Sequence, residues 1–298
     1  MKTKFLAIAL ATTFIAANLP PVRGAVVRTD DGFTLNTLGA IDDDPSASSS
    51  LGFTINFFGT SYSDVYVNNN GNVTFGAPST TFDPSGMAAA TLPIIAPFFA
   101  DVDTTGPGSG LVNYGSSTIN GHSAFGVNSL GVGYYGAQTD KLNSFQMVLI
   151  YRDDTGAGNF DIEFNYDQIQ WETGDASGGS GGLGGNSAVV GYSDGSGNYW
   201  EYAGSGVPGA FLDSNPTTGL IFNDIGSGEA GRYTLEVRDG LVIVPELSNS
   251  ALLIFGSLAA GTTGWRAWRR KRASAGRKRT EELLKAQVEA LTLPNTAV

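Results

Sequence analysis

The sequence contains no cysteine and only one histidine, His122, among its 298 residues. Without cysteine the chain has no disulfide bond, no thiol nucleophile and no zinc site with thiolate ligands. A single histidine excludes any metal site built from several imidazoles and leaves a serine nucleophile with one candidate base. The composition therefore argues against enzymes that depend on cysteine, on histidine or on zinc.

Basic residues are scarce between the two ends of the chain. Residues 25–240 contain five Lys or Arg against 24 Asp or Glu, a net charge of −19, whereas the whole chain carries −11. Such a segment is unsuited to nucleic acid, because contacts to phosphate require Lys and Arg. Residues 1–24 carry +3 and residues 265–298 carry +6. An acidic body between two basic ends is typical of an exported protein.

The N-terminus has the pattern of a secretory signal peptide. Lys2 and Lys4 precede an apolar run of 13 residues from Phe5 to Ala17, and cleavage is predicted after Ala17 or near Gly24. The run is too short to span a bilayer as a helix. We expect residues 1–24 to be a signal helix outside the folded body; the alternative is a retained N-terminal anchor.

The C-terminus carries a second targeting pattern. The 19 residues from Leu247 to Trp265 would span about 28 Å as a helix, close to the thickness of the hydrocarbon core. Trp265 and Trp268 suit the membrane interface, and the basic cluster that follows is expected to stay cytoplasmic. Glycine and threonine dilute the apolar run, so the sequence predicts a marginal transmembrane helix. The alternative is a buried or surface helix.

Three features of this region occur together: a short Val-Pro-Glu motif, an apolar helix and a basic cluster. The residues concerned are Val244, Pro245 and Glu246, then Arg269, Arg270, Lys271 and Arg272. Together they resemble the PEP-CTERM sorting signal of Gram-negative bacteria, although Leu247 replaces that family's second proline. The resemblance implies an exosortase-like sorting enzyme as a partner and a final location at the cell surface or in the extracellular matrix. Without processing, residues 241–272 would be a single-span anchor and residues 273–298 a short amphipathic cytoplasmic tail.

Residues 25–240 are predicted to form one all-β domain of the β-sandwich type with glycine-rich loops. The chain has 41 glycines, yet 41% of its residues are hydrophobic and 11% aromatic, so a core can form. In residues 160–166 apolar and polar residues alternate, as in a strand with one buried face. Nine short runs are rich in β-formers and separated by turn residues: 51–58, 64–67, 72–75, 111–114, 124–127, 145–151, 160–166, 188–192 and 232–237.

Turn and breaker residues predict local geometry in this domain. Asn70 and Gly71 are typical of a type I′ hairpin turn, which needs two residues with positive φ. Pro93 and Pro97 favour an edge strand or a kinked strand entry over the centre of a sheet. The glycine-rich segment 178–185 is expected to be a mobile loop.

Five blocks occur in order over the body: residues 57–76, 92–104, 142–149, 164–171 and 231–238. The first contains Tyr-Val-Asn-Asn-Asn-Gly-Asn-Val, and the second contains Ala-Pro-Phe-Phe-Ala-Asp-Val-Asp. Together these blocks resemble the nidogen-type extracellular domain, NIDO. The resemblance implies an extracellular adhesion or matrix-interaction module without enzymatic activity, and it names no ligand.

Asp101 and Asp103 form the most distinctive candidate site. In an extended segment carboxylates at positions i and i+2 share one face, and a glycine-rich loop follows them. Calcium prefers such oxygen ligands, so one interpretation is a calcium site, the sole cofactor considered, although the EF-hand order of ligands is absent. The other interpretation is a pair of carboxylates that cap loop amides. The run Asp42–Asp44 is expected to be a solvated turn.

Enzymatic interpretations have less support in the sequence. His122 lies in a predicted turn with no nucleophile elbow beside it. Asp101 paired with Glu163 or Glu172 would suit glycoside hydrolysis, but the sequence does not reveal their separation. We therefore expect a non-enzymatic binding module that contacts surface polysaccharide or a matrix protein. The alternatives are a carbohydrate-active enzyme and a purely structural surface-layer or matrix protein.

Overall fold

Short strands rich in β-branched and aromatic residues pair into two large antiparallel sheets. The computed structural model describes residues 26–28 and 32–245. This part of the chain is all-β, with about 46% strand and 4% helix. Its helical residues lie in the 3-10 turns η1 (Met87–Ala89), η2 (Asp175–Ser177) and η3 (Leu220–Phe222). The all-β prediction is confirmed, and each of the nine predicted runs overlaps an observed strand.

The larger sheet has eight strands, in the order β1-β7-β8-β9-β10-β15-β16, with β6 paired to β8. Long neighbouring strands form its centre, where β8, β9 and β10 pair in sequence order through hairpins. The bounds are β1 (Asn36–Thr37), β6 (Val102–Asp103), β7 (Val112–Ile119), β8 (His122–Tyr134), β9 (Gln138–Tyr151), β10 (Phe160–Gln168), β15 (Arg232–Arg238) and β16 (Leu241–Ile243).

The smaller sheet has six strands in the order β14-β13-β5-β4-β3-β2. A separate two-stranded hairpin, β11 (Gly179–Ser180) with β12 (Leu183–Gly184), lies outside both sheets. The bounds of the six strands are β2 (Ser49–Phe57), β3 (Thr60–Asn68), β4 (Asn72–Thr74), β5 (Ile94–Phe99), β13 (Val189–Ser193) and β14 (Tyr199–Glu201).

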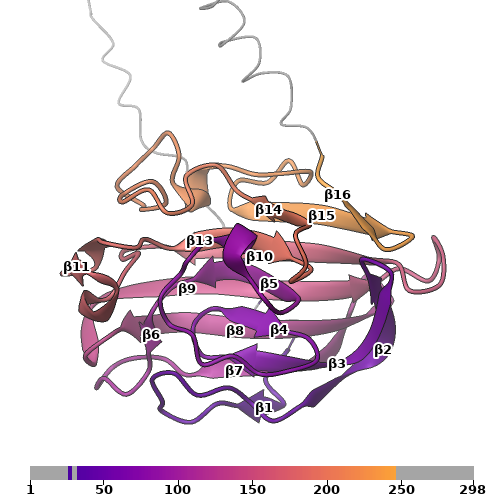
Figure 1. Ribbon diagram of the computed structural model, residues 1–298, viewed down its shortest axis with the longest axis horizontal. Helices are drawn as coiled ribbons and strands as arrows, with labels where there is room; N and C mark the ends of the chain where they lie inside the picture. The colour runs from indigo at the N-terminus through magenta and orange to yellow at the C-terminus, as the bar shows by residue number, and fades with distance from the viewer. Residues whose placement is uncertain (1–25, 29–31, 246–298) are drawn as a thin grey trace, which may run out of the picture.

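The two sheets face each other across one large hydrophobic core (Figure 1). Phe98 of the smaller sheet packs against Phe145 of the larger one, with ring centroids 5.3 Å apart. Trp171 meets Phe98 edge to face at 5.7 Å and donates its indole N–H to the carbonyl of Val132. This packing is that of a β-sandwich, in which the inner faces of two sheets supply the core.

The outer face of β10 is polar and nevertheless buried. Phe160, Ile162, Phe164 and Tyr166 belong to the core, as the alternation predicts. Glu163 points the other way, where Arg28 pairs with it at 2.7 Å. The amide of Val26 donates to Asp167 at 2.7 Å. Residues 26–28 therefore lie against the outer face of β10 and bind the buried Glu163 and the partly buried Asp167.

β5 lies at the centre of the smaller sheet, between β4 and β13, so the prediction that this segment avoids the centre of a sheet is wrong, although the strand does begin directly after Pro93. Proline is tolerated here because β4 pairs only with Ile94 and Ile95, before Pro97 is reached. On the other side the register with β13 shifts at this point. The missing N–H of Pro97 thus interrupts no regular ladder, and its carbonyl accepts a hydrogen bond from Tyr166 at 2.6 Å.

The glycine-rich segment 178–185 forms the β11–β12 hairpin instead of the predicted mobile loop. Gly178, Gly181 and Gly182 adopt positive φ angles, which glycine tolerates and which close this short hairpin. The hairpin is joined to the chain after β10, because the amide of Glu172 donates to the carbonyl of Gly182 at 2.8 Å.

The predicted terminal helices lie outside the described residues, in 1–24 and beyond 245. Among the residues that are described, no helix is long and apolar enough to cross a membrane. Val244 and Pro245 are described and follow β16 directly, whereas Glu246 and the cluster Arg269, Arg270, Lys271 and Arg272 lie outside. Residues 241–243, assigned from the sequence to the sorting region, form the edge strand of the larger sheet.

Candidate functional site

Asp101 lies at the corner between β5 and β6, on the side where the β3–β4 turn approaches. It is only 1% exposed. The side chain of Asn70 shapes the corner, since its carbonyl oxygen accepts a hydrogen bond from the amide of Val102 at 2.8 Å. The carbonyl of Asp101 accepts from the amide of Tyr135 at 3.1 Å. The main chain around Asp101 is therefore held, but these bonds do not involve its carboxylate.

Asp42 and Asp43 are the carboxylates that approach Asp101. One ligand oxygen from each of the three residues lies within 4.8 Å of the other two. Both oxygens of Asp101 and Oδ1 of Asp42 are buried without a hydrogen-bond partner. Asp43 accepts one hydrogen bond, from the amide nitrogen of Asn70 at 2.9 Å. Two residues of the run expected to be a solvated turn, Asp42 and Asp43, are thus partly buried and form an acidic cluster with the buried Asp101, whereas Asp44 is exposed.

Asn69 borders this cluster and is fully buried. Its amide nitrogen donates to the carbonyls of Asp42 and Val102, which join the loop before β2 to the β5–β6 corner. Its side-chain oxygen Oδ1 has no hydrogen-bond partner. A buried amide oxygen without a donor is uncommon in folded proteins and calls for an explanation.

The electrostatics of the cluster are those of confined like charges. Burial, followed by the charges of Asp42 and Asp43, raises the pKa of Asp101 to about 7. Burial, followed by the charge of Asp103, raises the pKa of Asp42 to about 6. Within the described residues no Lys or Arg forms an ion pair with Asp42, Asp43 or Asp101. Carboxylates in this arrangement favour a proton or a cation.

Asp103 is placed differently from Asp101. Its Oδ1 accepts from the amide of Thr105 at 2.8 Å and from the hydroxyl of the same residue. Its Oδ2 accepts from the amide of Ala137 at 2.7 Å. Asp103 therefore caps loop amides, the second interpretation of the sequence, while Asp101 stays without partners. The signal that could have located the rest of the cluster was the Asp42–Asp44 run.

Comparison with known proteins places this β-sandwich in a family. The family profile described as "NIDO related" matches residues 24–224, about two thirds of the chain. The chain belongs to the NIDO-related family. The match ends before β15, yet β15 pairs with β10 along six residue pairs and is part of the same sheet.

Individual relatives of this NIDO-related chain include alpha-tectorin and nidogen. Alpha-tectorin of Mus musculus is 34% identical over 192 aligned residues, and that of Homo sapiens is 33% identical. Nidogen of Drosophila melanogaster is 28% identical over 193 residues. Each match covers 56% of this chain but only 9% of alpha-tectorin and 14% of nidogen. No solved structure is a significant match.

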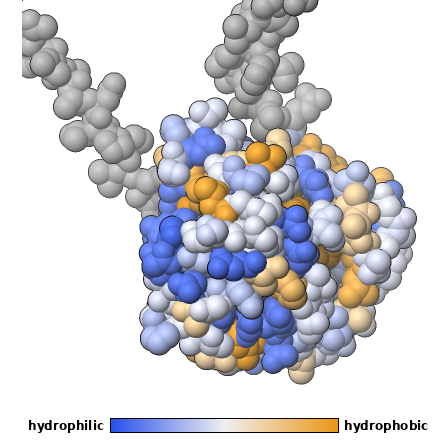
Figure 2. Space-filling model, turned by 60° about the vertical axis from the view of Figure 1, so that its left-hand side comes forward, coloured by the Kyte–Doolittle hydropathy of each residue, from blue (hydrophilic) through white to orange (hydrophobic). Residues whose placement is uncertain are grey.

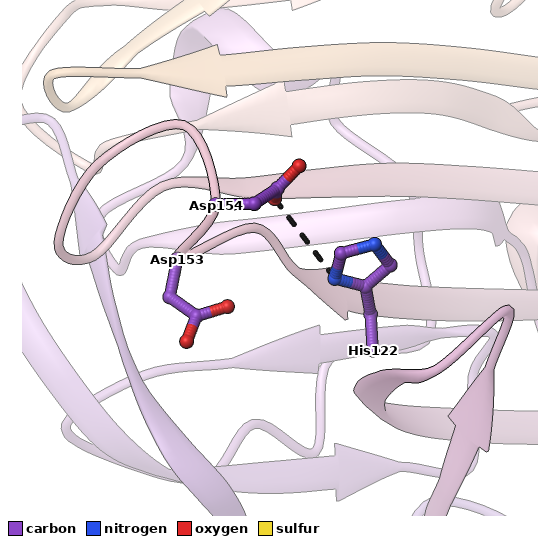
Figure 3. A group of neighbouring side chains, drawn as sticks. All are labelled: His122, Asp153 and Asp154. Atoms are coloured by element: carbon purple, nitrogen blue, oxygen red, sulfur yellow. Dashed lines mark ion pairs between the residues drawn. The ribbon is translucent and has the colours of Figure 1, made fainter.

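A second group of candidate ligands in the NIDO-related chain lies on the surface, where His122 approaches Asp153 and Asp154 (Figure 3). His122 begins β8 and its Nδ1 lies 3.9 Å from Asp154. Arg152 binds Asp154 more closely, at 2.9 Å, and this hydrogen bond lowers the pKa of the Asp154 carboxyl. Asp154 therefore forms surface ion pairs with both Arg152 and His122.

Glu163 and Glu172, the other carboxylates considered for catalysis, are both buried and both satisfied. Glu163 pairs with Arg28 and accepts from Asn165 at 2.7 Å. Glu172 accepts from the amides of Gly209 and Phe211. Neither belongs to a group with Asp101 among the described residues. The carboxylates of Glu163 and Glu172 are therefore engaged in contacts that hold the folded domain together.

The exposed residue Ser85, in the loop between β4 and β5, lines two grooves. One, of about 320 Å³, is lined mainly by hydroxyl, glycine and alanine residues of the segment 74–92. The other, of about 430 Å³, is lined by residues that include Asn186, Ser187 and Glu201. Both fall in the size range of ligand-binding clefts. The hydroxyl groups of the first groove suit a neutral polar ligand better than an ionic one, whereas the second groove also contains the carboxylate of Glu201.

Proposed function

We propose that this protein is an exported binding module of the cell surface or extracellular matrix, with a role in adhesion and no enzymatic activity of its own. The observation that carries this proposal is the NIDO-related match over most of the folded body. The relatives alpha-tectorin and nidogen are extracellular matrix proteins. They are much longer than the matched region, so the proposal concerns the domain and not their full activities.

The surface of the domain supports a polar ligand. In Figure 2 hydrophobic residues are scattered among polar ones and do not form one continuous patch on the visible face. Residues 25–240 carry −19, which disfavours nucleic acid and other polyanions. The grooves beside Ser85 offer hydroxyl and amide groups. Together these features favour a neutral surface polysaccharide, with a matrix protein as the other candidate partner.

The export route follows from the two ends of the chain. Residues 1–24 act as a signal peptide, and Val244, Pro245 and Glu246 with the basic cluster at 269–272 act as a PEP-CTERM-like signal for an exosortase-like enzyme. β16 ends at Ile243, so the sorting motif begins directly after the last strand of the folded body. Before processing, the C-terminal helix holds the protein in the inner membrane of a Gram-negative cell; afterwards the body reaches the cell surface or the matrix.

Binding by the purified full chain to an array of surface polysaccharides and matrix proteins tests this function. The variant Ser85→Arg places a long cationic side chain at the border of both grooves, and Ser214→Arg makes the same exchange at another exposed loop. We expect saturable binding by the wild type and Ser214→Arg, and binding at least about tenfold weaker by Ser85→Arg. Equal binding by all three would exclude the grooves as the binding site, and no saturable binding at all would favour a purely structural role.

The same array distinguishes the enzymatic alternative. A carbohydrate-active enzyme would shorten the bound polysaccharide during incubation, and chromatography of the released material would detect the fragments. Because Glu163 and Glu172 are buried and satisfied, we expect the polysaccharide to remain intact. Fragments produced by the wild type and lost in Glu163→Gln or Glu172→Gln would contradict the non-enzymatic proposal.

A further inference from the structure

We propose that Asp42, Asp43 and Asp101, together with the side-chain oxygen of Asn69, bind one calcium ion that joins three segments of the chain. The segments are the loop before β2, the β3–β4 turn and the β5–β6 corner. The carboxylate oxygens lie close enough together for one ion, each within 4.8 Å of the others. This site shares no residue with the grooves beside Ser85, and its test measures calcium alone, so the inference does not depend on the proposed function.

The missing partners of the cluster point to a ligand. Asp101 is 1% exposed and both of its carboxylate oxygens lack a hydrogen-bond donor. Oδ1 of Asn69 also lacks a hydrogen-bond partner; this residue is fully buried and its amide nitrogen donates to the main-chain carbonyl of Asp42. Buried polar atoms are satisfied in the great majority of native structures, and a buried carboxylate without a partner is especially costly. A cation among these oxygens would satisfy them together.

The amide of Asn69 is oriented by its own hydrogen bonds. Its nitrogen faces the carbonyls of Asp42 and Val102, so the opposite orientation would set oxygen against oxygen. The amide of Asn69 is therefore correctly oriented. Oδ1 lacks a hydrogen-bond donor in this orientation, and the lack does not arise from an exchange of the amide oxygen and nitrogen. This feature is independent of the acidic residues and adds a neutral oxygen ligand.

The chemistry of the donors selects a hard cation. All four side chains offer oxygen, and the chain has no cysteine and a single histidine, which lies in another group. Calcium accepts six to eight such oxygens at irregular angles and completes its shell with water. Magnesium requires a regular octahedron and loses its water reluctantly. Carboxylates drawn from separate irregular segments therefore fit calcium better.

The surrounding main chain already holds the ligands in place. Ile41 and Thr104 exchange hydrogen bonds, the Ile41 amide with the Thr104 hydroxyl at 3.0 Å and the Thr104 amide with the Ile41 carbonyl at 2.9 Å. The loop that carries Asp42 and Asp43 is thus tied to the strand that follows Asp101. Calcium would bind a largely preformed site and stabilise the folded state through mass action.

Calorimetric titration and thermal unfolding of the full chain, freed of metal by a chelator, test the proposal with calcium chloride as the probe. We expect one calcium ion per chain and an increase of about 5–10 °C in Tm when calcium is 100-fold above Kd. Asp101→Asn should weaken binding at least about tenfold and abolish most of the increase. Asp153→Asn removes one surface carboxylate of the other group and should behave like the wild type.

The order of the melting temperatures provides a second readout that does not rely on loss of binding. In chelator, Asp101→Asn should melt at the same temperature as the wild type or above it, because the substitution removes a buried unpaired charge. In calcium the order should reverse. A wild type whose Tm is unaffected by millimolar calcium would overturn the proposal and leave a protonated Asp101 as the explanation. Equal calcium binding by wild type and Asp101→Asn would overturn it as well.

Discussion

At the scale of single residues, Glu172 is a buried carboxylate whose donors are main-chain amides. It receives hydrogen bonds from the amides of Gly209 and Phe211 and from the hydroxyl of Ser187 at 3.5 Å. Burial raises the pKa of Glu172 above its ordinary value of 4.5, although these donors act in the opposite direction. The carboxylate thereby fixes the loop at residues 209–211 against the end of β10.

Glu172→Gln should lower the free energy of unfolding by about 1–3 kcal/mol, because the amide group sets a donor against a donor. The loss should depend on pH. The folded state raises the pKa of Glu172. The stabilisation that Glu172 adds to the free energy of unfolding is therefore complete below pH 4.5 and decreases as pH rises through the folded-state pKa. Urea unfolding at pH 4 and pH 8 should therefore show a smaller difference between wild type and variant at pH 8. A constant difference would contradict this assignment.

Single residues also show what the sequence could and could not predict about the candidate site. Asp101 stood out because two carboxylates alternate along an extended segment. Its neighbours Asp42 and Asp43 come from a distant loop, which is held at the corner by the hydrogen bonds between Ile41 and Thr104 and by the side chain of Asn69. Local spacing carries no such information. From the sequence, the role of Asp103 as an amide cap was only one of two alternatives. One of the capped amides, that of Ala137, is distant in the sequence, so local spacing does not reveal the contact.

At the scale of structural elements, the turn between β3 and β4 shows how the site is positioned. The sequence predicted a turn at Asn70 and Gly71, but only Gly71 has a positive φ, of 67°, so the turn is not type I′. The chain instead reverses over residues 69–71. As a result the side chains of Asn69 and Asn70 are buried and bind the loop before β2 and the β5–β6 corner.

Gly71 can be tested against a matched glycine in the following loop. A Cβ at Gly71 would overlap the carbonyl oxygen of Phe98, whereas a Cβ at Gly76 would meet no atom within 4 Å. Both residues have positive φ, so both alanine variants incur the cost of the left-handed backbone, about 1–2 kcal/mol. We expect Gly71→Ala to lower the free energy of unfolding by at least about 2 kcal/mol more than Gly76→Ala. Equal losses in urea unfolding would show that the close approach to Phe98 is unimportant.

The strands themselves were largely predictable, and the two exceptions both depend on contacts with residues outside the segment concerned. The alternation in β10 and the β-branched runs elsewhere reflect burial on one face, which is a local property. β5 was misplaced because proline is normally excluded from the centre of a sheet, and the register shift that accommodates Pro97 is formed with the distant β13. The β11–β12 hairpin was missed because its glycines are ordered through the contact with Glu172 and not through their own side chains.

At the scale of the whole molecule, charge and length divide the chain into three parts. The folded sandwich carries nearly all of the acidic residues, and the basic residues lie mostly at the two ends. The folded body contains few Lys and Arg residues. Four of them pair with carboxylates of the larger sheet and so have structural roles: Arg28, Arg152, Arg232 and Arg238. The acidic surface that remains suits an extracellular module that stays soluble and avoids polyanions.

We propose that the folded body works outside the cytoplasm as part of the cell surface or matrix. Fractionation of cells that express the full chain, with an antibody against the sandwich and the intact mass of the recovered protein, tests it most directly. We expect the body in the surface or matrix fraction, without residues 1–24 and ending near Glu246. A chain of full length in the cytoplasmic fraction, from Met1 to Val298, would contradict it.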